Sequence, residues 1–508
     1  MAQINVSNLT FCYDGSFDNI FENVSFSIDT NWKLGFIGRN GRGKTTFLNL
    51  LMGKYEYQGT ISTSTVFDYF PYQITDQQMK KCCGDFLDEI RPGCEFWRVI
   101  CELDKLHLEA DILYRPFETL SYGERTKVML AILFSEENYF LLIDEPTNHL
   151  DQASREIVKE YLRQKKGFIL ISHDRDLLDA CVDHVLALNR HSIEIQKGNF
   201  STWWENKSRT DAFHQLENEK HKKEIQKLKN AADRTRNWAD KNERSKIGFD
   251  PVKEHDRGIS ARAYIGAKTK KMQSRVKQME ERIASEIEQK EGLLQDIENT
   301  AELKILPLNH HKEVLVSAKR YGLTYVNGNT CHRVLENFDF ELRQGERIFL
   351  NGENGCGKSS FLKAILGCVE AENCQETGTL DTASGLVISY VSQDTSFLQG
   401  NLTEFCRERN LEESLVKAIL RKLDMNRVQF EKNIEDYSEG QKKKVLIAAS
   451  LSMQAHLYIW DEPLNYIDIF SRMQIEDLIL RYRPTMLVVE HDVRFQEKIA
   501  TKVVKMIP

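Results

Sequence analysis

Two short stretches with one pattern, "GRNGRGKT" (38–45) and "GENGCGKS" (352–359), decide how this sequence folds. Both fit G-x-x-x-x-G-K-[ST], in which glycines let consecutive backbone N–H groups curl around phosphate groups. Each stretch follows an apolar run typical of a buried strand and precedes a run typical of a helix. The residues expected to hold a nucleotide here are Gly38, Asn40, Gly41, Gly43, Lys44, Thr45 and Thr46 in the first stretch, and Gly352, Asn354, Gly355, Gly357, Lys358, Ser359 and Ser360 in the second.

The motif also gives roles to its last two residues. The Lys44 and Lys358 side chains would reach the β- and γ-phosphates. The hydroxyl groups of Thr45 and Ser359 would bind Mg²⁺. We therefore expect two phosphate-binding loops, each with its own metal ion.

The two loops belong to an internal repeat. Residues 9–53 align without a gap on residues 323–367, and later landmarks keep an offset of 317 or 318. Each copy alternates short β-branched runs with helical stretches, the pattern of an α/β sheet covered by helices. We expect an α/β fold with a first domain over 1–203, a helical linker over 204–312 and a second domain over 313–508.

Each copy also has an apolar strand that ends in two acids. "YFLLIDEP" ends in Asp144 and Glu145, and "LYIWDEP" ends in Asp461 and Glu462. The first acid of each pair is suited to hold Mg²⁺ through water, and the second to orient and deprotonate an attacking water. A helix cap is the structural alternative for paired acids at a strand end, but the phosphate-binding loops make it the weaker reading.

Two further matched motifs complete each copy. His173 in "ILISHDRD" and His491 in "LVVEHDVR" follow another apolar strand, where an imidazole would contact the γ-phosphate. A single histidine would more often be structural, but matched positions in both copies favour function.

"LSYGER" (120–125) and "YSEGQK" (437–442) each place a Ser and a Gly at the start of a helix. Such a helix start is an anion site, yet no phosphate within its own domain is placed to fill it.

These last motifs resemble the signature sequence of the ABC superfamily, and both copies resemble its nucleotide-binding domains. The resemblance implies an ATPase in which two domains pair head to tail. Each ATP would then lie between one domain's loop and the other's signature: Lys44 and Glu145 with Ser438 and Gly440, and Lys358 and Glu462 with Ser121 and Gly123.

The same resemblance assigns three more residues. Gln73 and Gln393 stand where the family has a glutamine that senses Mg²⁺, and Tyr13 where it has an aromatic ring that stacks on adenine. In the second copy the aligned residue is Asn327, with Tyr325 two positions earlier, so stacking at that site is not implied. Both catalytic carboxylates are present, and both sites are therefore expected to hydrolyse ATP.

Charge is segregated between the two copies. Residues 207–282 hold 21 Lys and Arg against 12 Asp and Glu, whereas the whole chain holds 69 against 76. Apolar spacing and helix breakers predict two helices folded back on each other around a tip near 243–259. Within 258–279 there are six positive side chains and no acid: Arg262, Lys268, Lys270, Lys271, Arg275 and Lys277. A solvated helix face is the plain alternative for such a run.

Tandem ATPase domains joined by a charged helical hairpin, with "GNFSTWWENK" (198–207) running into it, resemble the ABC-F family. The opening of the second linker helix, "YIGAKTKKMQSR" (264–275), resembles the Lsa- and Vga-type antibiotic-resistance members. The resemblance implies binding to the 70S ribosome at the tRNA exit site and displacement of lincosamides, pleuromutilins or streptogramin A. The six charges and Phe249 at the tip would face ribosomal RNA and tRNA.

Composition and the lack of targeting signals narrow the class of protein and its cellular location. Hydrophobic residues make up 41% and charged residues 29%, which fits a soluble globular protein. No apolar run is long enough for a membrane span, the N-terminus lacks a secretion signal, and 11 scattered cysteines favour free thiols in the cytoplasm. We expect a monomer without a membrane subunit. A housekeeping translation factor, and less so the ATPase subunit of a drug exporter, remain as alternatives.

Overall fold

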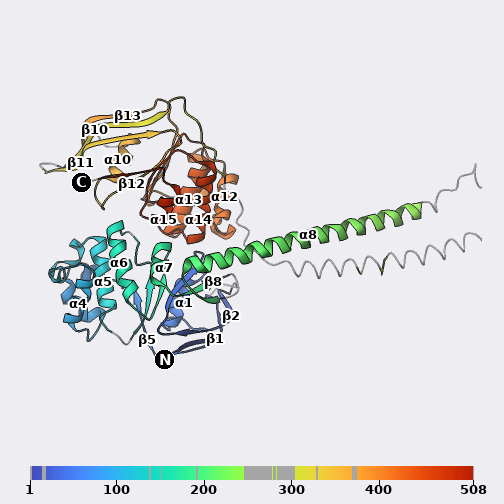
Figure 1. Cartoon of the computed structure of the whole chain (residues 1–508), viewed down its shortest axis with the longest axis horizontal. Coiled ribbons are helices and arrows are strands. Elements are labelled where there is room, and N and C mark those ends of the chain that lie inside the picture. The colour runs from blue at the N-terminus through green and yellow to red at the C-terminus, as the bar shows by residue number, and fades with distance from the viewer. Residues whose placement is uncertain are drawn as a thin grey trace, which may run out of the picture. The chain divides into compact units, whose positions relative to one another are not determined.

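The structure, a computed structural model, describes residues 3–13, 19–136, 139–148, 150–189, 193–244, 277–278, 282, 304–327, 330–368 and 374–506. Residues Met1–Trp203 and Thr300–Pro508 form one compact unit, and Trp204–Asn299 form another. The first unit contains both copies of the repeat, and the second contains the segment between them (Figure 1).

A six-stranded sheet forms the centre of the first copy. Its strands are β5 (Val66–Phe70), β6 (Tyr139–Asp144), β7 (Phe168–Ile171), β3 (Lys33–Gly38), β8 (His184–Leu188) and β9 (Ile193–Lys197), in that spatial order. All neighbours are parallel except β8 and β9. A smaller antiparallel sheet has the order β2 (Phe21–Asp29), β1 (Gln3–Phe11) and β4 (Gln58–Ser62).

The helices of the first copy follow the expected alternation with strands. They are α1 (Lys44–Leu51), α2 (Asp76–Met79), α3 (Cys83–Ile90), α4 (Phe96–Lys105), α5 (Tyr122–Leu133), α6 (Gln152–Gln164) and α7 (Arg175–Cys181), with the 3₁₀ turns η1 (Ala110–Tyr114) and η2 (Phe117–Thr119). The α2–α5 segment lies between β5 and β6 in sequence, so the signature helix α5 belongs to an insertion before the strand that carries the paired acids.

The second copy repeats this plan. Its parallel sheet has the order β14 (Ile388–Val391), β15 (Leu457–Asp461), β16 (Met486–Val489), β12 (Arg347–Asn351) and β17 (Lys502–Lys505), and its antiparallel sheet has the order β11 (Thr330–Arg343), β10 (Val314–Asn327) and β13 (Cys374–Thr382). Its helices are α10 (Lys358–Ile365), α11 (Leu402–Glu408), α12 (Glu413–Lys422), α13 (Glu439–Ser452), α14 (Ile469–Tyr482) and α15 (Val493–Ile499), with η4 (Arg427–Glu431) and η5 (Ile434–Asp436).

Strand order explains why the motifs meet. Central parallel strands are covered on both faces and therefore read as continuous apolar runs, such as "FILI" in β7 and "MLVV" in β16, in which every residue is buried. In both sheets the strand before the histidine lies between the strand before the phosphate-binding loop and the strand that ends in two acids. Because parallel strands share one carboxyl edge, all three motifs emerge at the same edge.

One long helix begins at the end of the first copy and continues into the linker unit. Helix α8 (Phe200–Arg244) has 45 residues, about 68 Å at 1.5 Å per residue, and is drawn in green in Figure 1. It ends just inside the predicted tip. The remainder of that tip with Phe249, and the basic residues Arg262, Lys268, Lys270, Lys271 and Arg275, lie outside the described residues. Lys277 is described as helical and exposed. Within the described ranges, no helix is both long and apolar enough to span a membrane.

Candidate active site

Both phosphate-binding loops are folded around their own lysines. The Nζ atom of Lys44 donates to the carbonyls of Gly38 at 2.7 Å and Arg39 at 3.2 Å. Lys358 makes the corresponding pair of bonds within its own loop, each at 2.8 Å. The two lysines thus close their loops in the same way, and an arriving phosphate would compete with backbone carbonyls for each ammonium group.

A glycine allows each loop to turn into its helix. Gly43 precedes α1 with φ 101°, and Gly357 precedes α10 with φ 91°, in the left-handed region that favours glycine. A Cβ atom on Gly43 would lie 2.4 Å from Cγ2 of Ile20, and one on Gly357 would lie 2.5 Å from Cγ1 of Val334. Glycine is therefore required at both positions by backbone conformation and by space.

The first acid of each pair forms an oxygen-rich group with the loop hydroxyl. The Thr45 hydroxyl donates to Oδ2 of Asp144 at 3.0 Å, and the Tyr69 hydroxyl donates to the same atom at 3.2 Å. Burial raises the pKa of Asp144, whereas the Thr45 hydroxyl and Lys44 oppose the rise. In the second copy the Oδ1 atom of Asp461 is buried and has no hydrogen-bond partner among the described residues. Hydroxyl and carboxylate oxygens are the donors that Mg²⁺ prefers, so these residues fit a magnesium ion.

The second acid of the first copy has the properties of a base. Glu145 has φ 51°, and its backbone N–H donates to Ile171 O at 2.9 Å. Burial, together with the neighbouring charge of Asp144, raises the pKa of Glu145 to about 8. Its Oε1 atom has no hydrogen-bond partner among the described residues, although His173 Nε2 lies 3.5 Å away. A carboxylate with a pKa near the operating pH is suited to accept a proton from water.

Asn40 joins the loop to the histidine and to the second copy. Its Nδ2 atom donates to the backbone carbonyl of Tyr466 at 2.7 Å, and its Oδ1 atom lies 3.0 Å from His173 Nε2 and 3.4 Å from Lys44 Nζ. Burial lowers the pKa of His173 well below its ordinary value, and the charge of Lys44 lowers it further. The imidazole is therefore neutral, with its proton on Nε2 facing the Asn40 oxygen.

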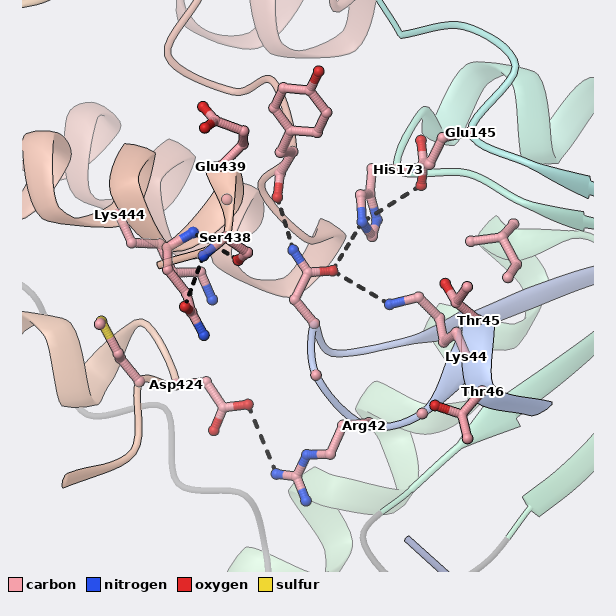
Figure 2. Close-up of a pocket in the computed structure, with 18 of the residues that line it drawn as sticks. Arg42, Lys44, Thr45, Thr46, Glu145, His173, Asp424, Ser438, Glu439 and Lys444 are labelled. Atoms are coloured by element: carbon pink, nitrogen blue, oxygen red, sulfur yellow. Dashed lines mark hydrogen bonds and ion pairs between the residues drawn. The ribbon is translucent and has the colours of Figure 1, made fainter. Parts of the chain in front are cut away.

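Residues of both copies line one cavity of about 820 Å³. The first copy supplies Tyr13, Ile20, Asn40, Gly41, Arg42, Gly43, Lys44, Thr45, Thr46, Asp144, Glu145, Asn148, Ile171 and His173. The second copy supplies Asp424, Met425, Asn426, Gln429, Ser438, Glu439, Gly440, Gln441, Lys444 and Tyr466. Figure 2 shows Lys44, Thr45 and Glu145 on one side and Ser438 and Glu439 on the other. The structure thus brings the first loop to the second signature.

The predicted stacking tyrosine lies at this cavity, and the predicted magnesium-sensing glutamine does not. The Tyr13 hydroxyl is 2.7 Å from the Thr46 hydroxyl, and its ring packs edge-on against Phe11 and Tyr55. Gln73 is exposed and is not among the residues that line the cavity. The structure thus places Tyr13 beside the first loop at this cavity and Gln73 outside its lining.

Part of the cavity was not expected from sequence. Asp424, Met425, Asn426 and Gln429 precede the second signature and match no phosphate-binding motif. The Asp424 carboxylate lies 3.7 Å from the guanidinium groups of both Arg39 and Arg42. The sequence does show two arginines, Arg39 and Arg42, at the variable positions of the first loop. It does not show which acid lies beside them, because that depends on the tertiary structure.

In the second copy, contacts converge on Glu462. Its Oε2 atom accepts hydrogen bonds from Gln393 Nε2 at 2.9 Å and Asn465 Nδ2 at 2.7 Å, and its Oε1 atom lies 3.8 Å from His491 Nε2. Burial raises the pKa of Glu462. Burial, together with the positive charge of Arg155 from the first copy, lowers the pKa of His491 to about 3. Gln393 thus lies with the predicted base, unlike Gln73.

The signature serines begin their helices. Ser121 caps α5 together with Glu124, and Ser438 caps α13 together with Gln441, each by a reciprocal pair of side-chain bonds to backbone N–H. Gly123 lies in the first turn of α5. Each serine Oγ atom accepts the backbone N–H of the residue three positions later, at 3.3 Å from Glu124 and 3.4 Å from Gln441. The remaining predicted residues of the second loop, Asn354, Gly355, Ser359 and Ser360, lie between β12 and α10 or in the first turn of α10.

Comparison with known proteins gives matches along the whole chain. The family model described as "ABC transporter" matches residues 21–148 and 335–465. The ribosome protection protein VmlR of Bacillus subtilis is 27% identical over 491 residues, covering 96% of this chain and 84% of VmlR. The erythromycin resistance ATP-binding protein MsrA of Staphylococcus epidermidis is 27% identical over 483 residues, covering 92% of this chain and 91% of MsrA.

Two other matches widen the range of relatives. The energy-dependent translational throttle protein EttA of Haemophilus influenzae is 23% identical over 537 residues, covering 96% of this chain and 88% of EttA. Among solved structures, the archaeal ribosome recycling factor aABCE1, crystallised with the stalk protein aP1, has a TM-score of 0.60 at 17% identity, covering 98% of this chain and 87% of that one. This likeness supports the tandem α/β fold.

Proposed function

This chain belongs to the ABC transporter family, as a tandem ATPase of the ABC-F type, and we propose that it is an ATP-driven, ribosome-binding protein that protects ribosomes from antibiotics. Its two ABC domains bind and hydrolyse ATP. One observation carries the composite-site mechanism: Lys44 and Glu145 of the first domain line the same cavity as Ser438 and Gly440 of the second.

The chemistry at the first site follows from its residues. Backbone N–H groups of the loop and Lys44 would hold the phosphates, and the Ser438 hydroxyl would donate to the γ-phosphate from the opposite domain. Glu145 would accept the proton of the attacking water, while the neutral His173 would donate from Nε2. Bound at Thr45 and Asp144, Mg²⁺ would neutralise phosphate charge. The same roles fall to Lys358, Glu462, His491 and Ser359 in the second site, with Ser121 and Gly123 across from them.

The linker would be the part that acts on the ribosome. Its basic residues in 258–279 would lie against RNA phosphates at the tRNA exit site, and Phe249 at the tip would reach toward the peptidyl-transferase centre. The match to the ribosome protection protein VmlR spans the linker as well as both domains. Lincosamides, pleuromutilins and streptogramin A are the drugs we propose to be displaced. The name of MsrA adds erythromycin to the drugs that deserve testing.

Co-sedimentation with 70S ribosomes tests the proposal. The double variant Glu145→Gln/Glu462→Gln keeps shape and ATP binding but removes both bases. Its ATP hydrolysis should fall by about 10²–10⁴-fold, the usual contribution of general-base catalysis. The variant should then pellet with ribosomes in ATP and remain in the supernatant in ADP. Wild-type hydrolysis would contradict the choice of bases, and failure to pellet in ATP would contradict ribosome binding.

A housekeeping translation factor is the second candidate, favoured by the match to EttA over 96% of this chain. Drug susceptibility separates the two. A protection protein raises the inhibitory concentration of ribosome-targeting drugs and leaves drug-free growth unchanged, whereas a translation factor alters polysome profiles without drug. An ATPase that energises a drug exporter would lower the cellular content of labelled drug and leave drug binding to purified ribosomes unchanged.

A further inference from the structure

The two ATPase domains differ at two aligned positions beside the predicted bases. Thr126 in the first domain aligns with Lys443 in the second, in the frame that aligns the two signature serines. Ser172 aligns with Glu490, in the frame that aligns the two histidines. Two small neutral side chains in one copy thus correspond to two opposite charges in the other. The pair of changes leaves the net charge of the domain the same.

Among the described residues of the first domain, the hydrogen bonds of both side chains are local. The Thr126 hydroxyl donates to the carbonyl of Tyr122, one turn earlier in its own helix, at 3.0 Å. The Ser172 hydroxyl accepts the backbone N–H of Asp174, two residues away, at 3.1 Å. Neither bond joins one motif of the first ATP site to another.

Lys443 reaches across motifs in the second domain. Its side chain is 3% exposed, and its Nζ atom donates to Ser392 O at 2.9 Å and Glu462 O at 3.2 Å. Ser392 directly precedes Gln393, whose amide binds the Glu462 carboxylate. Lys443 therefore fixes the glutamine segment and the backbone of the base to one helix. The bond to Glu462 O also restrains a backbone with φ 46°, a conformation that costs about 1–3 kcal/mol in a non-glycine residue.

Glu490 makes the complementary connection with its two oxygens. It is 3% exposed, and it accepts the backbone N–H of Leu464 at 3.1 Å and of His491 at 2.7 Å. Leu464 lies in the loop after Glu462, so Glu490 joins that loop to the histidine. Burial raises the pKa of Glu462, the charge of Glu490 raises it further, and that of Lys443 opposes the rise. The two charges thus act on Glu462 in opposite directions.

We propose that Lys443 and Glu490 are positioning residues of the second ATP site, which hold Gln393, Glu462 and His491 in a fixed arrangement that the first site achieves without them. The inference rests on the proposed role of Glu462 as the base. It predicts that the two sites depend on different residues for the same reaction. Loss of either side chain should therefore slow hydrolysis at the second site alone.

Single-turnover hydrolysis in a Glu145→Gln background reads the second site by itself. There Lys443→Thr and Glu490→Ser, which install the residues of the first domain, should each lower the rate at saturating ATP by about 10–100-fold, since a displacement near 1 Å can cost about 10²-fold. Half-saturating ATP should change by less than about threefold, because the groups that hold the phosphates remain. Lys443→Arg should retain most of the rate, and Glu490→Gln, which keeps one acceptor oxygen, should lie between.

The reciprocal background and a matched pair control for folding. In Glu462→Gln, where the first site alone hydrolyses, the same substitutions should change the rate by less than about threefold. Lys417→Thr and Glu413→Ser make identical changes in an ion pair of 2.5 Å on α12, at the surface of the same domain, and should leave both sites unchanged. Thermal unfolding identifies any variant that is not folded. If Lys443→Thr or Glu490→Ser is not folded, the rate of the conservative variant at the same position, Lys443→Arg or Glu490→Gln, is used in its place.

The outcomes separate this inference from the proposed function. In the Glu145→Gln background, second-site hydrolysis that continues at the parent rate after Glu462→Gln would show that Glu462 is not the base. If Glu462→Gln abolishes that hydrolysis but Lys443→Thr and Glu490→Ser turn over like the parent, the positioning role is overturned. An increase in half-saturating ATP alone, or an equal slowing of the first site, would overturn it as well.

Discussion

The phosphate-binding loops allow a test in which two glycines of one loop are compared. Gly43 has φ 101°, and an added Cβ would meet Cγ2 of Ile20 at 2.4 Å. Gly41 has φ 78°, and an added Cβ would meet nothing within 4 Å. Both positions are left-handed, so Gly→Ala costs about 1–2 kcal/mol of conformational strain at either one. The substitutions differ only in whether the new methyl group has room.

The difference has a predictable size. Ile20 is β-branched and cannot swing its Cγ2 methyl group away without moving its backbone or changing rotamer. Overpacking of this kind costs about 1–3 kcal/mol. For a domain of about 200 residues, 1 kcal/mol lowers Tm by about 2–4 °C, so Gly43→Ala should melt between about 2 and 12 °C below Gly41→Ala. The second domain repeats the comparison, with Gly357 against Val334 at 2.5 Å and Gly355 in open space.

Differential scanning calorimetry without nucleotide measures this directly, because ligand binding would otherwise add its own stabilisation. Each domain serves as the internal reference for substitutions in the other. Gly43→Ala should also weaken ATP binding more than Gly41→Ala, since the turn into α1 must move. Equal melting temperatures for Gly43→Ala and Gly41→Ala, repeated for Gly357→Ala and Gly355→Ala, would refute the steric argument and leave only backbone strain.

Three further perturbations have definite expected results. The pKa of Glu145 is about 8 in the folded protein and about 4.3 in an unfolded chain, so between these two pH values the folded state binds an extra proton. The first domain should therefore lose stability as the pH rises from about 5 to 8. Melting temperatures measured against pH should show this decrease in the wild type and a smaller one in Glu145→Gln. Changing Lys268, Lys270 and Lys271 to Gln should reduce the slope of log K for ribosome binding against log monovalent salt, at fixed Mg²⁺, by about 2–3; an unchanged slope would assign these lysines to a solvated face. Replacing 242–258 by a short Gly/Ser turn should keep ATP hydrolysis and ribosome binding within a few-fold and abolish protection in a susceptibility assay; full protection would argue against ribosome protection as the mechanism.

Local sequence determines much of the site. The loop around Lys44 and Lys358, the strand end at Asp144 and the capped helix at Ser438 each depend on a few neighbouring residues, and the structure has each of them where the motif predicts. The α/β fold with two tandem domains, read from the repeat and its strand–helix alternation, is confirmed. These features could be predicted because short-range geometry and strand order suffice to define them.

The rest depends on distant parts of the chain. Asp424 lies near Arg39 and Arg42 although some 380 residues separate them in sequence, and no spacing rule connects them. The sequence shows Glu490 directly before His491. The hydrogen bond that Glu490 accepts from Leu464 N cannot be predicted from sequence, because it depends on the conformation of the loop that follows Glu462. A residue-by-residue comparison of the two copies would have drawn attention to Glu490, because it aligns with Ser172; the two motifs also differ in charge where Arg175 aligns with Val493 and Asp176 with Arg494.

The Lys443 and Glu490 pair has an evolutionary consequence. If the two domains descend from one duplicated ancestor, the route between Thr126 with Ser172 and Lys443 with Glu490 needs two substitutions. Each single step adds or removes one charge beside Glu462, at a position where the side chain is only 3% exposed, and so changes the balance of charge around the base. Leaving a buried polar group without its partners costs about 1–3 kcal/mol and more for a charged group, which is a substantial part of the 5–15 kcal/mol by which a domain is stable. The effects of substitutions at the two positions should therefore be epistatic. A mutational scan that changes one residue at a time would score Lys443→Thr and Glu490→Ser as harmful, although the first domain uses Thr and Ser together at the aligned positions.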